Sequence, residues 1–214
     1  MTGPSTPGIR TIVNKAMASF IYLASQSPRR RQLLEQLGVA HELLLPDATE
    51  DAEALEEVHG KESPATYVKR VTALKLTAAL ARRQRRGLPA APVLCSDTTV
   101  ALGGILFGKP INAADARRML SELSGRTHRV LTAVAVGTER RQVQALSESR
   151  VTFAPMSRAQ IDAYVASGEP MGKAGAYAVQ GSAAAHLSHI SGSYSGIMGL
   201  PLFETAQLLR SFRL

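Results

Sequence analysis

The sequence contains a single cysteine and no tryptophan. One cysteine excludes an internal disulfide, and we therefore expect a reducing, cytoplasmic location. Cys95 lies in the apolar run Val93-Leu94-Cys95, where we expect a small buried hydrophobic side chain rather than a nucleophile. No apolar run approaches the roughly 20 residues that a bilayer span requires, so no membrane partner is expected.

Aromatic residues are also scarce, with five Phe and five Tyr, whereas the formal net charge is +8. A positive balance favours anionic partners of any kind. Single-strand nucleic-acid binders interleave basic residues with stacking aromatic residues, and the sequence lacks such a stripe, so no stable nucleic-acid partner is expected. The densest basic run, 82–86, precedes Gly87. We expect it to be the solvated end of a helix, where cations complement the helix dipole.

Strand and helix patterns alternate along the chain without internal repeats, which indicates an α/β fold with a mixed sheet. Residues 1–17 are rich in Gly, Pro and Thr, and we expect a flexible tail there, followed by a single domain over 18–214. The longest predicted helix should bury Tyr67, Val68, Val71 and Leu74. Strands are predicted at 19–24, 93–102, 129–136, 143–153 and 182–190, and helices at 28–37, 64–86, 113–123, 158–167 and 201–212.

The segment 23–31 is typical of a strand end, a tight polar turn and the opening of a helix. Ser27 is a favoured N-cap and Pro28 a favoured first helical residue. The first turn of such a helix carries unpaired backbone N–H groups and the positive end of the dipole, which suit a phosphate. Arg29 and Arg30 add positive charge. The alternative is an ordinary N-cap followed by solvated arginines.

A carboxylate, Asp97, interrupts the apolar strand predicted at 93–102. Because an unpaired buried carboxylate costs several kcal/mol, it needs a cation, a metal or hydrogen-bond donors. The structural alternative is a pairing with a nearby arginine. The functional interpretation places Asp97 at a cleft, where it holds Mg²⁺ or activates water. Mg²⁺ prefers one or two carboxylates together with substrate phosphate oxygens, so the pattern indicates metal-assisted attack on a phosphate anhydride.

His186 and His189 have the spacing of some metal-ligand pairs. A strand over 182–190 would direct them to opposite faces, so the sequence does not favour a zinc site.

Several short motifs occur in the order found in one known family, and together they cover nearly everything after residue 20. On these motifs the chain resembles the Maf-family nucleoside triphosphate pyrophosphatases. The motifs are Leu23-Ala24-Ser25 with Ser27-Pro28-Arg29-Arg30, then 96–100, Gly108-Lys109-Pro110, 123–128, 173–177, Gln180-Gly181, 192–194 and 199–202.

The resemblance implies an inosine-triphosphatase-like fold, with an elongated mixed β-sheet, flanking helices and a cleft between two lobes. It implies cleavage of a nucleoside triphosphate between the α- and β-phosphates, with a divalent metal cation, Mg²⁺ or Mn²⁺. The products would be the monophosphate and pyrophosphate. A homodimer is compatible with the resemblance. A regulator of cell division that binds nucleotide or nucleic acid without turnover is the alternative function.

The resemblance also implies roles for individual residues. Asp97 matches the catalytic acid, and Glu50 is the expected second acid, which would hold the metal together with Asp97. The Glu50 match is the weakest, because the acidic segment offers neighbours one residue away. The residues expected around the substrate are Ser25, Arg29, Arg30, Glu50, Lys75 and Lys109.

Three positions distinguish branches of the family, and here they are Arg29, Thr98 and Gln180. This set resembles the branch that acts on dTTP and UTP, whereas the branch that acts on 7-methyl-GTP has Trp, Gln and Glu. An amide such as Gln180 both donates and accepts hydrogen bonds, which suits the O4/N3 edge of uracil or thymine. The chain departs from this branch at Gly172, where most members have Asp.

Overall fold

A computed structural model describes residues 20–47, 50 and 54–214. The tail predicted for residues 1–17 and the first residue of the strand predicted at 19–24 lie outside the described residues.

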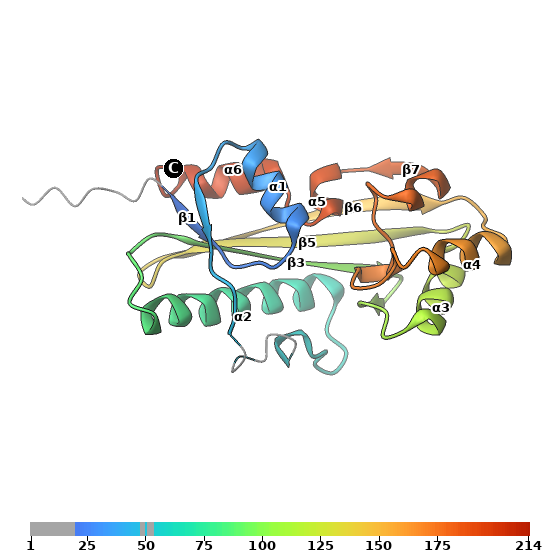
Figure 1. The fold of residues 1–214 in the computed structure, drawn as a ribbon, viewed down its shortest axis with the longest axis horizontal. Helices are drawn as coiled ribbons and strands as arrows, with labels where there is room; N and C mark the ends of the chain where they lie inside the picture. The colour runs from blue at the N-terminus through green and yellow to red at the C-terminus, as the bar shows by residue number, and fades with distance from the viewer. Residues whose placement is uncertain (1–19, 48–49, 51–53) are drawn as a thin grey trace, which may run out of the picture.

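The described residues form an elongated seven-stranded sheet in the order β2-β1-β3-β5-β6-β7, with β4 paired to β3 (Figure 1). β1 runs parallel to β2 and β3, and all other pairs are antiparallel, so the predicted mixed α/β sheet is confirmed. The strands are β1 (Ile21–Leu23), β2 (His41–Leu43), β3 (Val93–Leu102), β4 (Ile105–Phe107), β5 (Thr127–Gly137), β6 (Gln142–Phe153) and β7 (Leu187–Ser191).

The helices begin at the caps that the sequence indicates. The hydroxyl of Ser63 accepts from the backbone N–H of Thr66, and Asn112 caps the next long helix. Ser157 and Gln160 form a capping box. The helices are α1 (Pro28–Gln36), α2 (Pro64–Arg85), α3 (Ala113–Leu123), α4 (Arg158–Ala166), α5 (Tyr194–Met198) and α6 (Leu202–Arg210), with 3₁₀ turns η1 (Ala54–Glu56), η2 (Ala174–Ala176) and η3 (Ser182–His186).

Helices cover both faces of the sheet at the end where β1 pairs with the start of β3 (Figure 1). α1 and α6 lie on one face and α2 on the other. Alternate residues of β3 point to opposite faces of the sheet. Leu94 packs with residues of α1 and α6, whereas Val93 and Cys95 pack with residues of α2. Cys95 is fully buried, as predicted, and burial raises the pKa of its thiol to about 12.

The opposite end of the sheet supports a second lobe. There, α3, α4 and the segment 174–183 pack over β5 and β6 around a large apolar cluster that includes Met119, Phe153 and Tyr164. The two lobes share the long strands β3, β5 and β6. Among the described residues, every helix falls short of what a membrane span requires in length or apolar character.

One expectation for α2 is wrong and another is only partly confirmed. Leu74 is exposed, with a relative accessibility of 38%. The buried face of the helix contains Val71, Thr72 and Leu76 instead. In the basic run 82–86, Arg82 and Arg83 are buried rather than solvated, whereas Gln84, Arg85 and Arg86 are exposed as expected. Arg82 and Arg83 continue the buried face of α2, and each guanidinium donates to one backbone carbonyl and to one carboxylate.

The strand predicted at 182–190 is shorter than expected. Residues 182–186 form η3, and only Leu187–Ser191 pair with β6. His186 therefore ends a 3₁₀ turn, and His189 lies in the strand that follows.

Candidate active site

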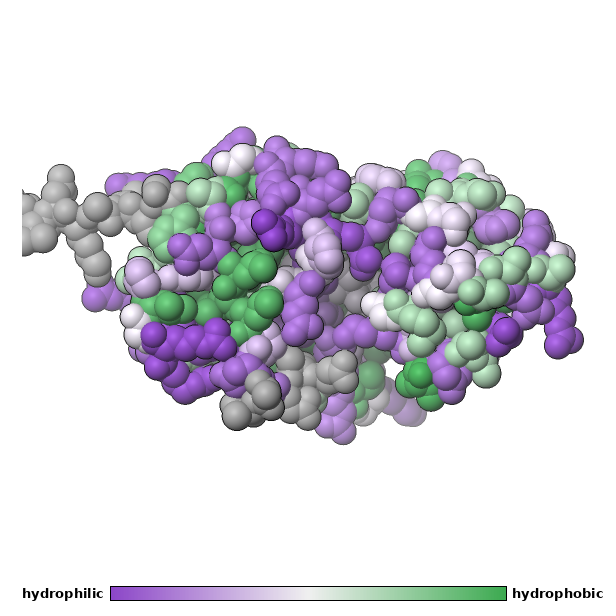
Figure 2. Space-filling view, in the orientation of Figure 1, coloured by the Kyte–Doolittle hydropathy of each residue, from purple (hydrophilic) through white to green (hydrophobic). Residues whose placement is uncertain are grey.

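A cleft of about 680 Å³ lies between the two lobes. Hydrophilic side chains border the hollow near the middle of the face in Figure 2. The cleft is lined by the β1–α1 turn, the inner face of α2, the middle of β3, Gly108 and Lys109, and the segments 171–180 and 197–199. The site residues predicted from the sequence all line this single cleft: Ser25, Arg29, Arg30, Glu50, Lys75, Asp97, Thr98, Lys109 and Gln180.

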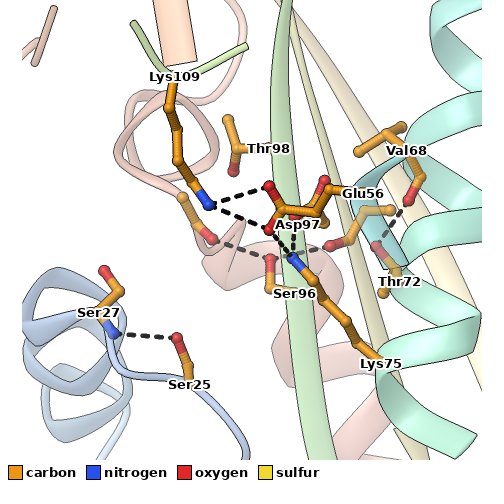
Figure 3. A network of polar contacts seen from close by, with 12 residues as sticks. Ser25, Ser27, Glu56, Val68, Thr72, Lys75, Ser96, Asp97, Thr98 and Lys109 are labelled. Atoms are coloured by element: carbon orange, nitrogen blue, oxygen red, sulfur yellow. Dashed lines mark hydrogen bonds and ion pairs between the residues drawn. The ribbon is translucent and has the colours of Figure 1, made fainter. Parts of the chain in front are cut away.

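The β1–α1 turn presents a helix start to the cleft. The backbone N–H of Ser27 donates to Ser25 Oγ at 3.2 Å, so the Ser25 hydroxyl closes the turn (Figure 3). Ser27 occupies the N-cap position, but its side chain makes no capping hydrogen bond, and Pro28 is the first helical residue. The Ser27 side chain thus leaves the N–H groups of the first turn to other acceptors, which is compatible with the anion site predicted for this segment.

Arg30 links the turn to two other parts of the cleft wall. Its Nε donates to the Gly199 carbonyl at 2.8 Å, its Nη1 to Ser25 Oγ at 3.3 Å and its Nη2 to Thr98 Oγ1 at 3.4 Å. Burial lowers the pKa of Arg30, and the negative charge of Asp97 offsets part of that shift. The guanidinium is thus a fixed positive charge between the helix start and β3.

A network of two acids and two lysines lies across the cleft from α1 (Figure 3). Lys75 Nζ donates to Asp97 Oδ1 at 2.6 Å and to Glu56 Oε1 at 2.7 Å. Lys109 approaches from the other side and donates to Glu56 Oε2 at 2.9 Å. A carboxylate in an apolar strand needs a cation or hydrogen-bond donors, and the buried Asp97 has Lys75 as this partner.

Glu56 is held in place by α2. The Tyr67 hydroxyl donates to the Glu56 carbonyl at 2.9 Å, and Arg70 Nη2 donates to the Glu57 carbonyl at 2.7 Å. Burial raises the pKa of Glu56, but the Lys75 and Lys109 ammonium groups outweigh it and hold the pKa below its usual value. Burial, Asp97 and Glu56 together raise the pKa of Tyr67 to about 12, so Tyr67 remains a neutral donor near pH 7.

Glu50 has different partners. Arg82 Nη2 donates to its Oε2 at 2.6 Å, and Arg85 Nη2 donates to its Oε1 at 2.8 Å. The hydrogen bond from Arg82 is the main reason that the pKa of Glu50 is lowered. Its carboxylate lines the cleft, but it is engaged by the end of α2 rather than by Lys75 or Lys109.

The predicted specificity residues make no hydrogen bond to the two acids among the described residues. Thr98 Oγ1 accepts from Arg30 and shares a hydrogen bond of 2.9 Å with Thr132 Oγ1. Gln180 is an exposed residue of the cleft wall. Burial lowers the pKa of Lys173 and the charge of Arg29 lowers it further, so Arg29 acts on the same part of the wall.

The chemistry of the acid pair fits a hard divalent cation. Asp97 and Glu56 both offer carboxylate oxygens around the one nitrogen of Lys75. Within residues 20–47, 50 and 54–214, no three His, Cys, Asp or Glu side chains form a group that could hold a metal ion. A carboxylate pair with substrate phosphates is the arrangement that Mg²⁺ prefers in proteins.

Comparison with known proteins adds an independent observation. The model of the family described as "Maf-like protein" matches residues 20–212. The chain belongs to the Maf family. The "dTTP/UTP pyrophosphatase" of Albidiferax ferrireducens is 76% identical over 196 residues, which are 92% of this chain and 98% of that protein. The protein of the same name from Cupriavidus metallidurans is 66% identical over 194 residues, 91% of this chain and 97% of that protein.

Among solved structures, this Maf chain is similar to the Ham1 protein of Staphylococcus aureus. The TM-score is 0.37 at 12% sequence identity, over 63% of this chain and 71% of that chain.

Sequence reasoning did not single out Glu56, which the structure places between the two lysines of the cleft. Nothing in the spacing of the acidic segment distinguishes Glu56 from Glu50 or Glu57. Only the contacts with Lys75, Lys109 and Tyr67 single it out, and these depend on how η1 lies against α2.

Proposed function

We propose that this chain hydrolyses dTTP and UTP to the monophosphate and pyrophosphate. The observation that carries the proposal is the cluster of Lys75, Asp97, Glu56 and Lys109 facing the start of α1 in one cleft. The relatives described above carry the name "dTTP/UTP pyrophosphatase" and align over nearly their whole length, which supports the reaction and the substrates.

In this proposal the triphosphate lies between α1 and the lysines. Backbone N–H groups of the first turn, with Ser25, Arg29 and Arg30, bind phosphate oxygens. Lys75 and Lys109 exchange their carboxylate partners for the substrate and neutralise the charge that develops on the leaving pyrophosphate. Asp97 accepts a proton from the water that attacks the α–β anhydride. A bond forms between the water oxygen and the α-phosphorus, and the bond between the α-phosphorus and the bridging oxygen breaks as pyrophosphate departs.

We further propose that Asp97 and Glu56 hold the divalent cation, Mg²⁺ or Mn²⁺, and that Glu56 takes the role first assigned to Glu50. When bound, the cation would supply charge stabilisation to the phosphates. Glu50 would instead pair with Arg82 at the end of α2, where Arg82 also donates to the Leu44 carbonyl at 2.8 Å.

The test of the function is a panel of nucleoside triphosphates incubated with the protein and Mg²⁺, with both pyrophosphate and phosphate measured. We expect dTTP and UTP to yield pyrophosphate, with little action on ATP or GTP. Release of phosphate instead of pyrophosphate would contradict the reaction, and a preference for 7-methyl-GTP would contradict the substrate assignment. Nucleotide binding without turnover would favour the regulatory alternative.

Gln180 is the residue proposed to read the base edge, and Gln180→Glu tests that role. The substitution is nearly isosteric, but it removes the amide donors and places a charge toward a base carbonyl. Losing one buried hydrogen bond typically costs about 1–3 kcal/mol, so kcat/KM for dTTP and UTP should fall by roughly one to two decades. The melting temperature should change little, because Gln180 is exposed. An unchanged rate for dTTP and UTP would mean that Gln180 does not contact the base.

A cytoplasmic location and a homodimer are also proposals. The first is supported by the single, buried cysteine and the second by the family resemblance.

A further inference from the structure

Glu169, just after the end of α4, is half-buried, and its carboxylate has a hydrogen-bond network that the proposed reaction does not use. Its Oε2 accepts from the Ser182 backbone N–H at 3.0 Å and from the Ser182 hydroxyl at 2.7 Å. Its Oε1 accepts from the Tyr164 hydroxyl at 3.0 Å. Glu169 does not itself line the cleft among the described residues, whereas Gln180, two residues before Ser182, does.

The segment that carries Gln180 packs directly on this carboxylate. A Cβ atom built on Gly181 would lie 2.0 Å from Glu169 Oε1 and 2.6 Å from its Cδ. The backbone φ of Gly181 is −98°, an angle open to any residue. A side chain at position 181 would therefore displace the Glu169 carboxylate from its present place, although the backbone angle itself would allow one.

The main chain of Glu169 holds a second part of the same wall. Lys173 Nζ donates to the Glu169 carbonyl and, at 3.4 Å, to the Met171 carbonyl. Met171 and Lys173 both line the cleft. One residue outside the cleft thus connects the two wall segments, 171–173 and 180–182.

The carboxylate is kept as an anion by its partners. Burial raises the pKa of Glu169, but the hydrogen bonds from Ser182, Tyr164 and the Ala183 backbone outweigh it, and the pKa is lowered. Hydrogen bonds to an ionised acceptor are stronger and more directional than neutral ones, so they restrict where the Ser182 backbone can lie.

We propose that Glu169 is a positioning residue for base selection, because it fixes residues 180–182 so that the Gln180 amide meets the edge of the pyrimidine. The inference rests on the proposed function, since it assigns the base to this end of the cleft. Glu169 contacts neither base nor phosphate in this proposal and acts through Gln180.

The experiment compares Glu169→Gln with the wild type. The amide is close in size, but it lacks the charge and has one acceptor oxygen where the carboxylate has two. We expect KM for dTTP and UTP to rise about tenfold, as for the loss of one charge-assisted hydrogen bond, with kcat within about threefold. The preference for dTTP over ATP should fall by a similar factor. The preference is also measured at equilibrium, as the ratio of the dissociation constants of the α,β-methylene analogues of dTTP and ATP, determined by calorimetry.

A double-mutant cycle distinguishes positioning from a general loss of structure. In a Gln180→Ala background, Glu169→Gln should change the dTTP/ATP ratio less than about twofold, because contacting or coupled residues are not additive. An additive effect in that background would overturn the proposal. Ser182→Ala removes one hydroxyl donor and keeps the backbone N–H, and it should lower the ratio to a smaller degree.

Circular dichroism establishes that each variant is folded. If Glu169→Gln does not fold, Ser182→Ala carries the test, and an unchanged binding ratio there would overturn the proposal. Failure of the proposed function has a different signature, which is a wild-type protein that prefers no pyrimidine nucleotide in either turnover or binding.

Discussion

Asp97→Asn is expected to give a folded protein that binds nucleotide and barely turns it over. Asparagine keeps the size and one acceptor oxygen for Lys75, which now lies 2.6 Å from Asp97 Oδ1, so the packing of β3 should survive. It cannot accept a proton from water or supply a full negative charge to a cation. A positioned general base is typically worth about 10²–10⁴ in rate, which is roughly 3–5 kcal/mol of barrier. The loss should therefore appear mainly in kcat.

The measurement is kcat and nucleotide affinity on one preparation, with circular dichroism as the test of folding. Asp162→Asn is a matched control, because Asp162 is half-exposed and pairs with Arg117 outside the cleft. It should retain the wild-type kcat. Near-normal kcat in Asp97→Asn would move the catalytic role elsewhere, and an unfolded variant would support a purely structural role for the Lys75–Asp97 pair.

Much of the fold is predictable because its signals are local. The side chains of Ser63, Asn112 and Ser157 cap the helices that follow them, and each cap concerns neighbours within one turn. The long strands β3, β5 and β6 lie where continuous or alternating apolar patterns place them. The same reasoning placed Asp97 inside a buried strand, which implied a partner without naming it.

The errors concern residues whose surroundings come from distant parts of the chain. Arg82 and Arg83 have the sequence of a solvated helix end, but carboxylates and carbonyls from other elements accept their hydrogen bonds. A long basic side chain can be buried when its charge is paired in this way. The contacts of Glu56 are also non-local, since Lys109 lies 53 positions further along the chain. Composition and spacing carry no information on such pairings.

Glu56→Gln is the second change with a large expected effect. Glutamine keeps an oxygen that Lys75 or Lys109 can contact but removes one of the two charges proposed to hold the cation. Residues that only contact a metal ligand already change metal affinity or activity by about 10–100-fold when they are mutated. We therefore expect Glu56→Gln to weaken the affinity of the protein for Mg²⁺ by at least about tenfold. The readouts are the Mg²⁺ dependence of kcat and Mn²⁺ binding, measured by calorimetry with α,β-methylene dTTP present.

Glu50→Gln is the matched comparison, because it makes the same chemical change in the same acidic segment. Its partner Arg82 is buried, with 6% of its side chain exposed. Removing one partner of a buried ion pair costs up to about 3–5 kcal/mol, so Glu50→Gln should lower the free energy of unfolding in a urea titration. Mn²⁺ affinity should stay within about threefold, since a carboxylate held by Arg82 and Arg85 is not a ligand in this assignment. The reverse pattern, in which Glu50→Gln weakens the metal and Glu56→Gln does not, would return the second acid to Glu50.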